Sequence, residues 1–332
     1  MCAAVRWCGA ATTQGGERAT GAAKPPSRSY EETSGAFTTS MATSSVPSRR
    51  RWRRPVVTAM LMALGEHLCR ARVIGQGLRT EHVHRWRERV TLNKPLGRQN
   101  RMRVAFASDL HAGRMTPTGT ITAAFEALME ASPDLILLGG DYVCSLPEEL
   151  ELILPSLGRL RAPCGVFAVL GNHDHCSNAT SITAELEAIG IHVLRNRSVQ
   201  LEEPFGNVLL VGLEDHLGGK AKPSEARWDA DCATLLLIHQ PSGLLDAGDR
   251  PFDLALAGHT HGGQITLPGG YAPIAATGPL SRRYRAGRYP LASGGVLCVS
   301  VGVGQSLLPL RIGPSSEVLI VDLVGSQAGA HP

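Results

Sequence analysis

Five short polar segments contain the residue types and spacings that suit metal chemistry. They are Asp-Leu-His at 109–111, Gly-Gly-Asp at 139–141, Gly-Asn-His-Asp at 171–174, Ile-His at 238–239 and Gly-His-Thr-His at 258–261. Their carboxylates, amide and imidazoles can hold two divalent metal ions side by side. Such a pair of ions generates a nucleophile from water and holds a phosphate ester in front of it. The five segments therefore predict a dinuclear metal phosphoesterase.

Each of these segments directly follows an apolar run. The runs cover residues 103–108, 134–139, 166–170, 234–238 and 252–257. Near-continuous apolar runs bounded by turn residues indicate strands that are buried on both faces. In open α/β sheets the carboxyl ends of the strands form the crevice that binds ligands. We therefore expect the five polar segments to meet at one edge of the fold.

Taken singly, each segment also has a purely structural interpretation. Asp109 alone is typical of a helix N-cap, and a lone His at a strand end is more often a hydrogen-bonded, half-buried residue than a ligand. Gly-Asn-His-Asp alone is consistent with a turn. Five coincidences at five strand ends favour a metal site instead. Gly140, Gly171 and Gly258, each just before a predicted ligand, indicate turns where the backbone comes close to the site.

The order Asp-x-His, Gly-Asp, Gly-Asn-His-Asp, His, Gly-His-x-His resembles the calcineurin-like metallophosphoesterase superfamily. The resemblance covers about residues 101–323, roughly two thirds of the chain. Two further runs, at 258–264 and 301–311, resemble a bacterial branch of membrane-associated or exported phosphodiesterases. That branch also includes pyrophosphatases of lipid precursors. The resemblance thus implies hydrolysis of a phosphate ester or anhydride.

The resemblance also implies a ligand set and catalytic roles. One metal ion takes Asp109, His111, Asp141 and His261, and the other takes Asp141, Asn172, His239 and His259. Asp141 then bridges the two ions, and a hydroxide that also bridges them attacks phosphorus. His173 protonates the leaving group, so His173 and Asn172 are the residues assigned to catalysis. Oxygen and imidazole ligands suit Mn, Fe or Zn, and the lack of Cys ligands argues against a closed structural zinc.

The fold implied by the resemblance is a four-layer α/β/β/α sandwich, with the dinuclear site at the carboxyl ends of the strands. Helical periodicity predicts helices over 119–130, 147–160 and 178–189. Apolar runs predict further strands over 206–213, 295–301 and 317–323. The chain contains 43% hydrophobic and 19% charged residues, which is the composition of a globular protein.

One position departs from the family pattern. Many members carry a second Asp three residues after the Gly-Asp segment, and that Asp orients the catalytic His; here the position is Cys144. Support for His173 must therefore come from Asp174 or from a backbone carbonyl. The segment 142–146 also lacks the Arg that protein phosphatases of the superfamily use, which argues against a phosphoprotein substrate.

Charge divides the chain into an acidic catalytic region and a basic leader. Residues 1–103 contain 19 Lys and Arg against 6 Asp and Glu, whereas residues 104–332 contain 14 against 23. We predict a disordered leader over 1–48, a basic and partly apolar arm over 49–100, a metallophosphoesterase domain over 101–325 and a tail over 326–332. The leader is rich in Ala, Gly, Ser and Thr and shows no apolar period.

The arm has three interpretations. Its run of Arg at 49–54 is followed by an uncharged stretch at 55–65, which is too short to cross a bilayer. We favour a segment that lies on an anionic membrane surface, with Trp52 and Trp86 as interfacial anchors. The alternatives are a twin-arginine export signal and a helix packed on the domain. The eight Cys are scattered without paired spacing, which favours reduced thiols and a cytoplasmic location. Together with the basic arm, this predicts a cytoplasmic protein at the periphery of the membrane.

A Gly- and Pro-rich segment at 267–290 follows the last predicted ligand. Its Arg282, Arg283 and Arg285 are predicted to bind substrate, either a second phosphate or a lipid head group; the alternative is a solvated loop. The favoured substrate is lipid- or nucleotide-linked. The alternative functions are a soluble phosphodiesterase of small diesters and a metal-binding scaffold of the same fold without catalysis. No module that reads bases is present in the sequence, so we expect no sequence-specific binding of nucleic acid.

Overall fold

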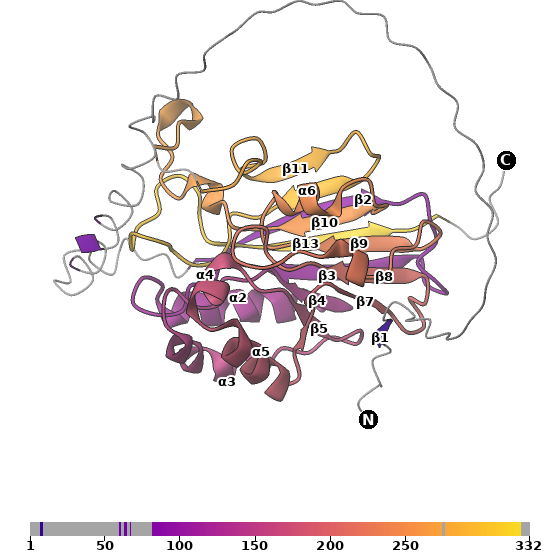
Figure 1. Cartoon of the computed structure of the whole chain (residues 1–332), viewed down its shortest axis with the longest axis horizontal. Coiled ribbons are helices and arrows are strands. Elements are labelled where there is room, and N and C mark those ends of the chain that lie inside the picture. Colours follow the sequence, from indigo (N-terminus) through magenta and orange to yellow (C-terminus); the bar gives the residue numbers. More distant parts are fainter. Residues whose placement is uncertain are drawn as a thin grey trace, which may run out of the picture.

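The computed structural model describes residues 82–273 and 276–326, together with Trp7–Cys8 and the separate residues Met60, Ala63, Leu64 and His67. Two β-sheets pack face to face, and helices cover the outer face of one of them (Figure 1). A short helix and several loops cover the outer face of the other sheet. The predicted four-layer α/β/β/α sandwich is therefore confirmed, with a thin fourth layer.

The first sheet has six strands in the order β2-β13-β3-β4-β5-β6. They are β2 (His84–Thr91), β3 (Arg101–Ala107), β4 (Leu135–Leu138), β5 (Val166–Ala168), β6 (His192–Val193) and β13 (Glu317–Val324). Neighbours from β3 to β6 are parallel, whereas β13 runs antiparallel to β3. All four residues of β4 are buried, because helices cover one face of this strand and the second sheet covers the other.

The second sheet has seven strands in the order β1-β7-β8-β9-β10-β12-β11. They are β1 (Trp7–Cys8), β7 (Arg197–Gln200), β8 (Val208–Gly212), β9 (Ala233–Leu237), β10 (Leu254–Ala257), β11 (Gly287–Pro290) and β12 (Val296–Val299). Strands β8, β9, β10 and β12 are parallel to one another, so their carboxyl ends share one edge. The predicted strands over 206–213, 295–301 and 317–323 correspond to β8, β12 and β13.

The helices lie mainly against the six-stranded sheet. They are α2 (Thr118–Glu130), α3 (Leu154–Leu157), α4 (Asn172–Ser177), α5 (Ala179–Ala188) and α6 (Gly243–Ala247), with 3-10 turns η2 (Pro147–Leu152), η3 (Pro223–Glu225), η4 (His261–Gly263) and η5 (Pro268–Gly270). Helix α2 buries Ile121, Phe125 and Leu128, which lie on one face at helical spacing, against the sheet. Helices α2 and α5 confirm the predictions for 119–130 and 178–189.

The single helix predicted over 147–160 is wrong. The chain forms η2, is interrupted at Ile153 with a φ of −120°, and then forms the four-residue helix α3. Pro155 explains the interruption, because proline cannot donate the backbone hydrogen bond of a helix interior and its ring collides with the preceding turn. Proline is accepted in the first turn of a helix, and Pro155 lies in the first turn of α3.

The apolar layer between the sheets fixes how their edges meet. Phe106 and Phe167 from the first sheet pack against Leu210, Leu235 and neighbouring side chains of the second. Burying one such side chain contributes roughly 1.5–3 kcal/mol, so this layer strongly stabilises the relative position of the two sheets. The carboxyl ends of β3, β4 and β5 are thereby held opposite those of β9 and β10.

The predicted domain start at residue 101 is wrong. Strand β2, which falls inside the predicted basic arm, pairs in parallel with β13 along all eight of its residues. Arg85, Arg87 and Arg89 alternate with Trp86 and other inward residues, so the arginines belong to the exposed face of an edge strand. Trp86 packs against the core between the sheets and donates to Glu88, which removes it from the predicted membrane anchors.

Most of the predicted leader and arm, including Trp52 and the stretch at 55–65, lies outside the described residues, as does the tail beyond residue 326. Within the segment predicted to be disordered, Trp7 and Cys8 pair with Val199 and Ser198 of β7. Met60 and Leu64 are helical and exposed. No helix among the described residues combines the length and the hydropathy needed to cross a bilayer.

Candidate metal centre

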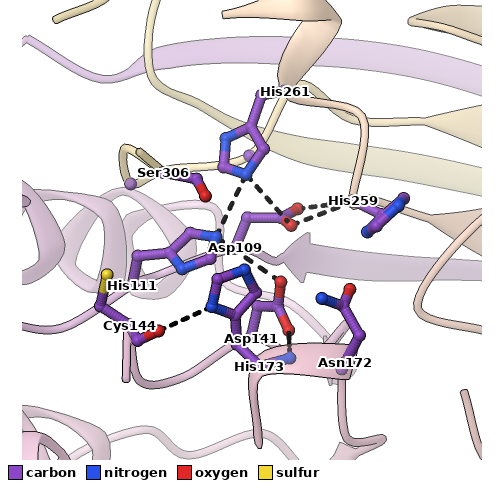
Figure 2. A network of polar contacts seen from close by, with 12 residues as sticks. Asp109, His111, Asp141, Cys144, Asn172, His173, His259, His261 and Ser306 are labelled. Carbon is purple, nitrogen blue, oxygen red and sulfur yellow. Dashed lines mark hydrogen bonds and ion pairs between the residues drawn. The ribbon is translucent and has the colours of Figure 1, made fainter. Parts of the chain in front are cut away.

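The five polar segments meet at one edge of the fold, where the two sheets face each other. Asp109, His111 and Asp141 follow β3 and β4, Asn172 and His173 begin helix α4 after β5, and His239, His259 and His261 follow β9 and β10. Figure 2 shows seven of these eight side chains pointing toward a common centre. All residues predicted as ligands or catalytic groups are thus brought together, although they span more than 150 positions of the chain.

One group of ligand atoms contains Asp109, His111 and His261. Nε2 of His111 lies 3.1 Å from Nε2 of His261, and the latter lies 3.7 Å from Oδ1 of Asp109. Asp109 and His111 are fully buried, and His261 is 7% exposed. The ligand atoms of all three lie within 4.8 Å of one another, which suits a single metal ion.

A second group contains Asn172, His239 and His259. Nε2 of His239 lies 3.1 Å from Oδ1 of Asn172 and 3.2 Å from Nδ1 of His259. Backbone carbonyls accept hydrogen bonds from the other ring nitrogens, from His239 Nδ1 at Gly139 and from His259 Nε2 at Thr277. These bonds fix both tautomers, so the lone pairs of His239 Nε2 and His259 Nδ1 point toward each other.

Asp141 lies between the two groups. Its Oδ2 is 3.6 Å from Nε2 of His111 in one group and 3.4 Å from Nε2 of His239 in the other. Its Oδ1 accepts a hydrogen bond of 2.9 Å from the backbone N–H of His173. One carboxylate oxygen is therefore used to fix the side chain, and the other faces both candidate ion positions.

These residues fit metal ions well. Ligands that surround one ion at about 2.1 Å lie about 3.0–3.4 Å from each other in octahedral or tetrahedral geometry. Most of the ligand-to-ligand distances at this site fall in or near that range. Electron pairs of nitrogen and oxygen atoms that face each other so closely repel unless a cation lies among them. The donor set therefore suits divalent cations.

Burial keeps most of the imidazoles in the neutral form that binds metal. Burial, together with repulsion by neighbouring imidazolium charge, lowers the pKa of His111 to about 3 and of His259 to about 4, and it holds that of His261 well below its ordinary value. His239 shows the opposite shift. Burial is the largest single influence and lowers its pKa, but attraction and hydrogen bonding by Asp141, together with attraction by Asp215 and Asp109, outweigh burial and raise the pKa well above the ordinary value. A proton on His239 is thus stabilised by the same charges that attract a metal ion.

The backbone at the site adopts conformations that side chains other than glycine rarely accept. Asp109, His111, Asp141, His259 and His261 all have φ between 44° and 71°. Such left-handed conformations cost free energy and persist only where the surroundings enforce them. Five of the predicted ligands share this strain, so the fold directs these side chains inward at a cost in stability.

Two glycines let the strand ends approach each other closely. A Cβ at Gly171 would lie 2.1 Å from Oδ1 of Asp141, and a Cβ at Gly258 would lie 2.1 Å from Oγ of Ser108. Neither gap accepts a methyl group. The prediction that the backbone comes close to the site at these two positions is confirmed, and close approach rather than unusual φ is the reason, since neither residue has a positive φ.

His173 lies at the edge of the site, and its ring meets that of His111 edge-on with centroids 4.7 Å apart. Its Nδ1 donates to the backbone carbonyl of Cys144 at 2.6 Å, as the dashed line in Figure 2 shows. The orienting group is therefore the carbonyl, one of the two candidates from the sequence. Many family members carry an Asp at position 144, and its side chain orients the catalytic His. Here the backbone carbonyl of Cys144 orients His173 instead.

Asp174, the other candidate, has a different task. It is fully buried, and its two carboxylate oxygens accept 2.8 Å hydrogen bonds from the backbone N–H groups of Asp141, Tyr142 and Gly171. A buried carboxylate with several backbone donors holds a loop in place. Asp174 thus fixes the turn that presents Asp141.

Arg311 is a residue of the site that the sequence interpretation missed. It is partly buried, and its guanidinium donates to the backbone carbonyls of Val301, Gly302 and Gly304. Nη2 also lies 3.3 Å from Nδ1 of His261. Burial lowers the pKa of Arg311 to about 10, so the group remains a cation at neutral pH. The run at 301–311 had been noted only as a family motif.

The arginines predicted to bind substrate lie outside the centre. Arg282 and Arg283 are exposed, and Arg283 lies over the ring of Tyr284 at 5.3 Å. Arg285 donates to the backbone carbonyl of Gly270, which links its segment to the loop after η4. Substrate binding by these three residues stays a prediction.

Comparison with known proteins supports the same chemistry. Residues 102–263, which include every predicted ligand, match the family described as Calcineurin-like phosphoesterase. Phosphodiesterase YaeI of Escherichia coli (strain K12) is 35% identical over 226 residues, which cover 67% of this chain and 82% of YaeI. The uncharacterized metallophosphoesterase YkuE of Bacillus subtilis (strain 168) is 32% identical over 227 residues, 65% of this chain and 77% of YkuE. A Bos taurus transmembrane protein with metallophosphoesterase domain is 27% identical, and the match covers 66% of this chain and 52% of that protein.

Proposed function

Because the chain belongs to the calcineurin-like phosphoesterase family and is a metal-dependent phosphoester hydrolase, we propose that it is a dinuclear phosphodiesterase or pyrophosphatase. One ion is held by Asp109, His111, Asp141 and His261, and the other by Asp141, Asn172, His239 and His259. The observation that carries this proposal is the position of Asp141 Oδ2, within 3.6 Å of Nε2 of both His111 and His239.

When bound, divalent ions at these positions would supply a nucleophile from water at neutral pH and would offset the charge that develops on the phosphate. The chain's own residues orient these ions and the substrate. Asp141 Oδ1 and its bond from the N–H of His173 keep the bridging carboxylate fixed. The hydrogen bonds that His239 and His259 donate to backbone carbonyls hold both rings in orientations that face the centre.

His173 is the group that protonates the leaving oxygen. Its Nδ1–H is held by the carbonyl of Cys144, which leaves Nε2 to donate a proton to the substrate. Its ring is only half-buried, whereas His111 and His239 are enclosed, so His173 is the imidazole that a bulky ester can reach. Asn172, directly before it in α4, places its amide oxygen beside His239.

The assay that tests this proposal is hydrolysis of bis-p-nitrophenyl phosphate by chelator-treated protein, before and after Mn²⁺ is added, with metal content measured by elemental analysis. We expect about two ions per chain and activity that returns with the metal. Tight binding of one ion per chain at full activity would contradict the dinuclear site. Full metal content without hydrolysis of any diester or anhydride would indicate a metal-binding scaffold.

The substrate class that we propose is lipid- or nucleotide-linked, and the proposed location is the periphery of a membrane on its cytoplasmic side. The basic run at 49–54 and the exposure of Met60 and Leu64, four residues apart and both helical, support this. Sedimentation of the full chain with anionic vesicles, compared with a variant carrying Met60→Ser and Leu64→Ser, tests the contribution of the arm. Appearance of the native protein outside the cytoplasm, cleaved after the arm, would favour the twin-arginine export signal instead.

A further inference from the structure

Three exposed apolar side chains gather on the loops that border the metal centre. Leu267 is 45% exposed, Tyr271 is 65% exposed and Ile312 is 45% exposed. The N–H of Thr266 donates to the carbonyl of Ile312, and that of Leu267 donates to the carbonyl of Tyr271, both at 2.8 Å. The three residues therefore lie on hydrogen-bonded segments, and we refer to them as the apolar rim.

The apolar rim is attached directly to the ligand-bearing loop. Gln264 follows η4, which begins at His261, and its Nε2 donates to the carbonyls of Ser306, Leu308 and Leu310 at 2.8–3.1 Å. Ile312 follows Arg311, whose guanidinium lies beside His261. A surface that contacts the apolar rim is consequently brought to the border of the metal centre.

The stretch of chain that carries the apolar rim contains no acidic residue. Residues 254–316 contain no Asp and no Glu but five Arg, whereas the rest of the region from 104 onward contains nine basic against 23 acidic residues. Arg282, Arg283 and Arg288 are exposed. The Arg285 side chain bonds to the carbonyl of Gly270 in η5, so the arginine segment lies against the loop of the apolar rim. A strongly asymmetric charge of this kind attracts an anionic surface.

Apolar side chains beside exposed arginines fit one class of partner best. A second copy of this chain would bring two equally positive surfaces together, which repel. Nucleic acid offers phosphates to the arginines but gives Leu267 and Ile312 no apolar environment. A bilayer of anionic lipid satisfies both features, because head-group phosphates meet the arginines and the interface accepts apolar side chains and tyrosine.

We propose that the catalytic domain itself docks on an anionic lipid bilayer through the apolar rim and Arg282, Arg283 and Arg288, with the metal centre facing the head groups. Docking by this surface is independent of the N-terminal arm. Its use in presenting a lipid-linked phosphodiester to the centre rests on the proposed function. The arginines predicted from the sequence to hold substrate then contact the bilayer around the substrate.

The test is sedimentation of the full chain with vesicles of phosphatidylglycerol and, separately, of phosphatidylcholine. The rim variant carries Leu267→Ser, Tyr271→Ser and Ile312→Ser. The matched control carries Leu146→Ser, Leu152→Ser and Leu245→Ser, three side chains that are 52–58% exposed elsewhere on the domain. We expect the partition coefficient on phosphatidylglycerol to fall at least tenfold in the rim variant and to change less than twofold in the control. Wild-type protein should bind phosphatidylcholine far more weakly.

Hydrolysis of soluble bis-p-nitrophenyl phosphate and the thermal unfolding midpoint of each variant are measured in parallel. Both should stay close to wild type, which separates docking from catalysis and from folding. If the triple variant unfolds, Arg288→Gln, at an exposed position outside the predicted substrate-binding residues, gives the same comparison with an expected loss of about fivefold. Equal binding by the rim variant and wild type would overturn the proposal. So would a rim variant whose only change is a shift from dimer to monomer in sedimentation velocity. If the wild-type protein hydrolyses no diester, the proposed function is contradicted, whereas the vesicle experiment still tests docking on the bilayer.

Discussion

The two halves of the metal centre are organised by charged side chains of opposite sign. On the six-stranded sheet, the anion of Asp174 gathers backbone N–H groups around Asp141. On the side of the seven-stranded sheet, the cation of Arg311 gathers backbone carbonyls around Gly302 and Gly304 and lies beside His261. One half therefore presents a charged bridging carboxylate, and the other keeps an imidazole neutral.

The difference shows how sign determines the role of a supporting residue. The Asp141 carboxylate is held through the backbone of its turn, which leaves Oδ2 free to face the imidazoles of His111 and His239. An imidazole must stay unprotonated to bind metal, and a neighbouring cation lowers its pKa, as burial and Arg311 do for His261. Gly302, whose carbonyl accepts from Arg311, must be a glycine for a steric reason. A Cβ at this position would lie 2.7 Å from Cβ of Asp109.

The largest effect is expected for Asp141→Asn. Asparagine accepts the left-handed backbone of this position, with φ of 56°, so the change removes charge without forcing the turn. We expect both ions to be lost and diester hydrolysis to fall by more than about 100-fold, beyond the range for groups that only support ligands. Elemental analysis and steady-state rates measure this. Asp109→Asn is the matched control, because it should empty only the His111–His261 position; two ions retained in Asp141→Asn would refute the bridge.

His173→Ala should separate catalysis from metal binding. If His173 donates the proton, metal content should remain as in wild type while the rate falls by about 10²–10⁴-fold for an alkyl leaving group. The loss should be much smaller for p-nitrophenolate, which leaves with little need of a proton. The same loss for both leaving groups would exclude the acid role. A loss of bound metal would show that His173 is a ligand, since its ring also lies in ligand range of His111 and Asp141.

Asp174→Asn tests the anionic support of the first half. The new amide N–H₂ must face at least one backbone N–H that now donates to a carboxylate oxygen, which leaves buried donors unpaired. We expect the free energy of unfolding to fall by about 2–4 kcal/mol, measured by urea titration of the metal-free protein. Asp246→Asn, at a partly exposed position paired with His216, is the control and should change it far less. An unchanged free energy of unfolding in Asp174→Asn would mean that the turn at Asp141 is stable without the Asp174 carboxylate.

Arg311→Lys gives the smallest expected effect and tests the cationic support of the second half. Lysine keeps the charge but cannot reach three carbonyls at once, because it lacks the planar fork of arginine. We expect the affinity for one of the two ions to fall by about 10–100-fold, with the other little changed. Isothermal titration with Mn²⁺ resolves the two steps, and Arg159→Lys on the exposed surface is the control. Equal weakening of both steps would show that Arg311 acts on the whole fold rather than on the His261 side.

The sequence alone predicted the candidate ligands and placed them at strand ends. Residues such as Asp109 and Asn172 follow apolar runs that indicate buried strands, and a strand end is encoded locally by its last apolar residue and by the turn that follows. The helices over 118–130 and 179–188 were predictable for the same reason, as apolar spacing is a local signal. Strand β2 was missed although its alternation of Arg85 and Trp86 was visible, because the density of charge suggested a solvated arm. The break before α3 was likewise visible in Pro155.

Only the tertiary structure decided which distant groups meet. The N–H of His259 donates to Asp109, 150 residues earlier, and Arg311 lies beside His261, 50 residues before it. The carbonyl of Cys144, which orients His173, has no side-chain signature at all. Such contacts depend on how two sheets pack across their shared apolar layer, and a local pattern of residues records which face of a strand is buried but not what the opposite sheet places there.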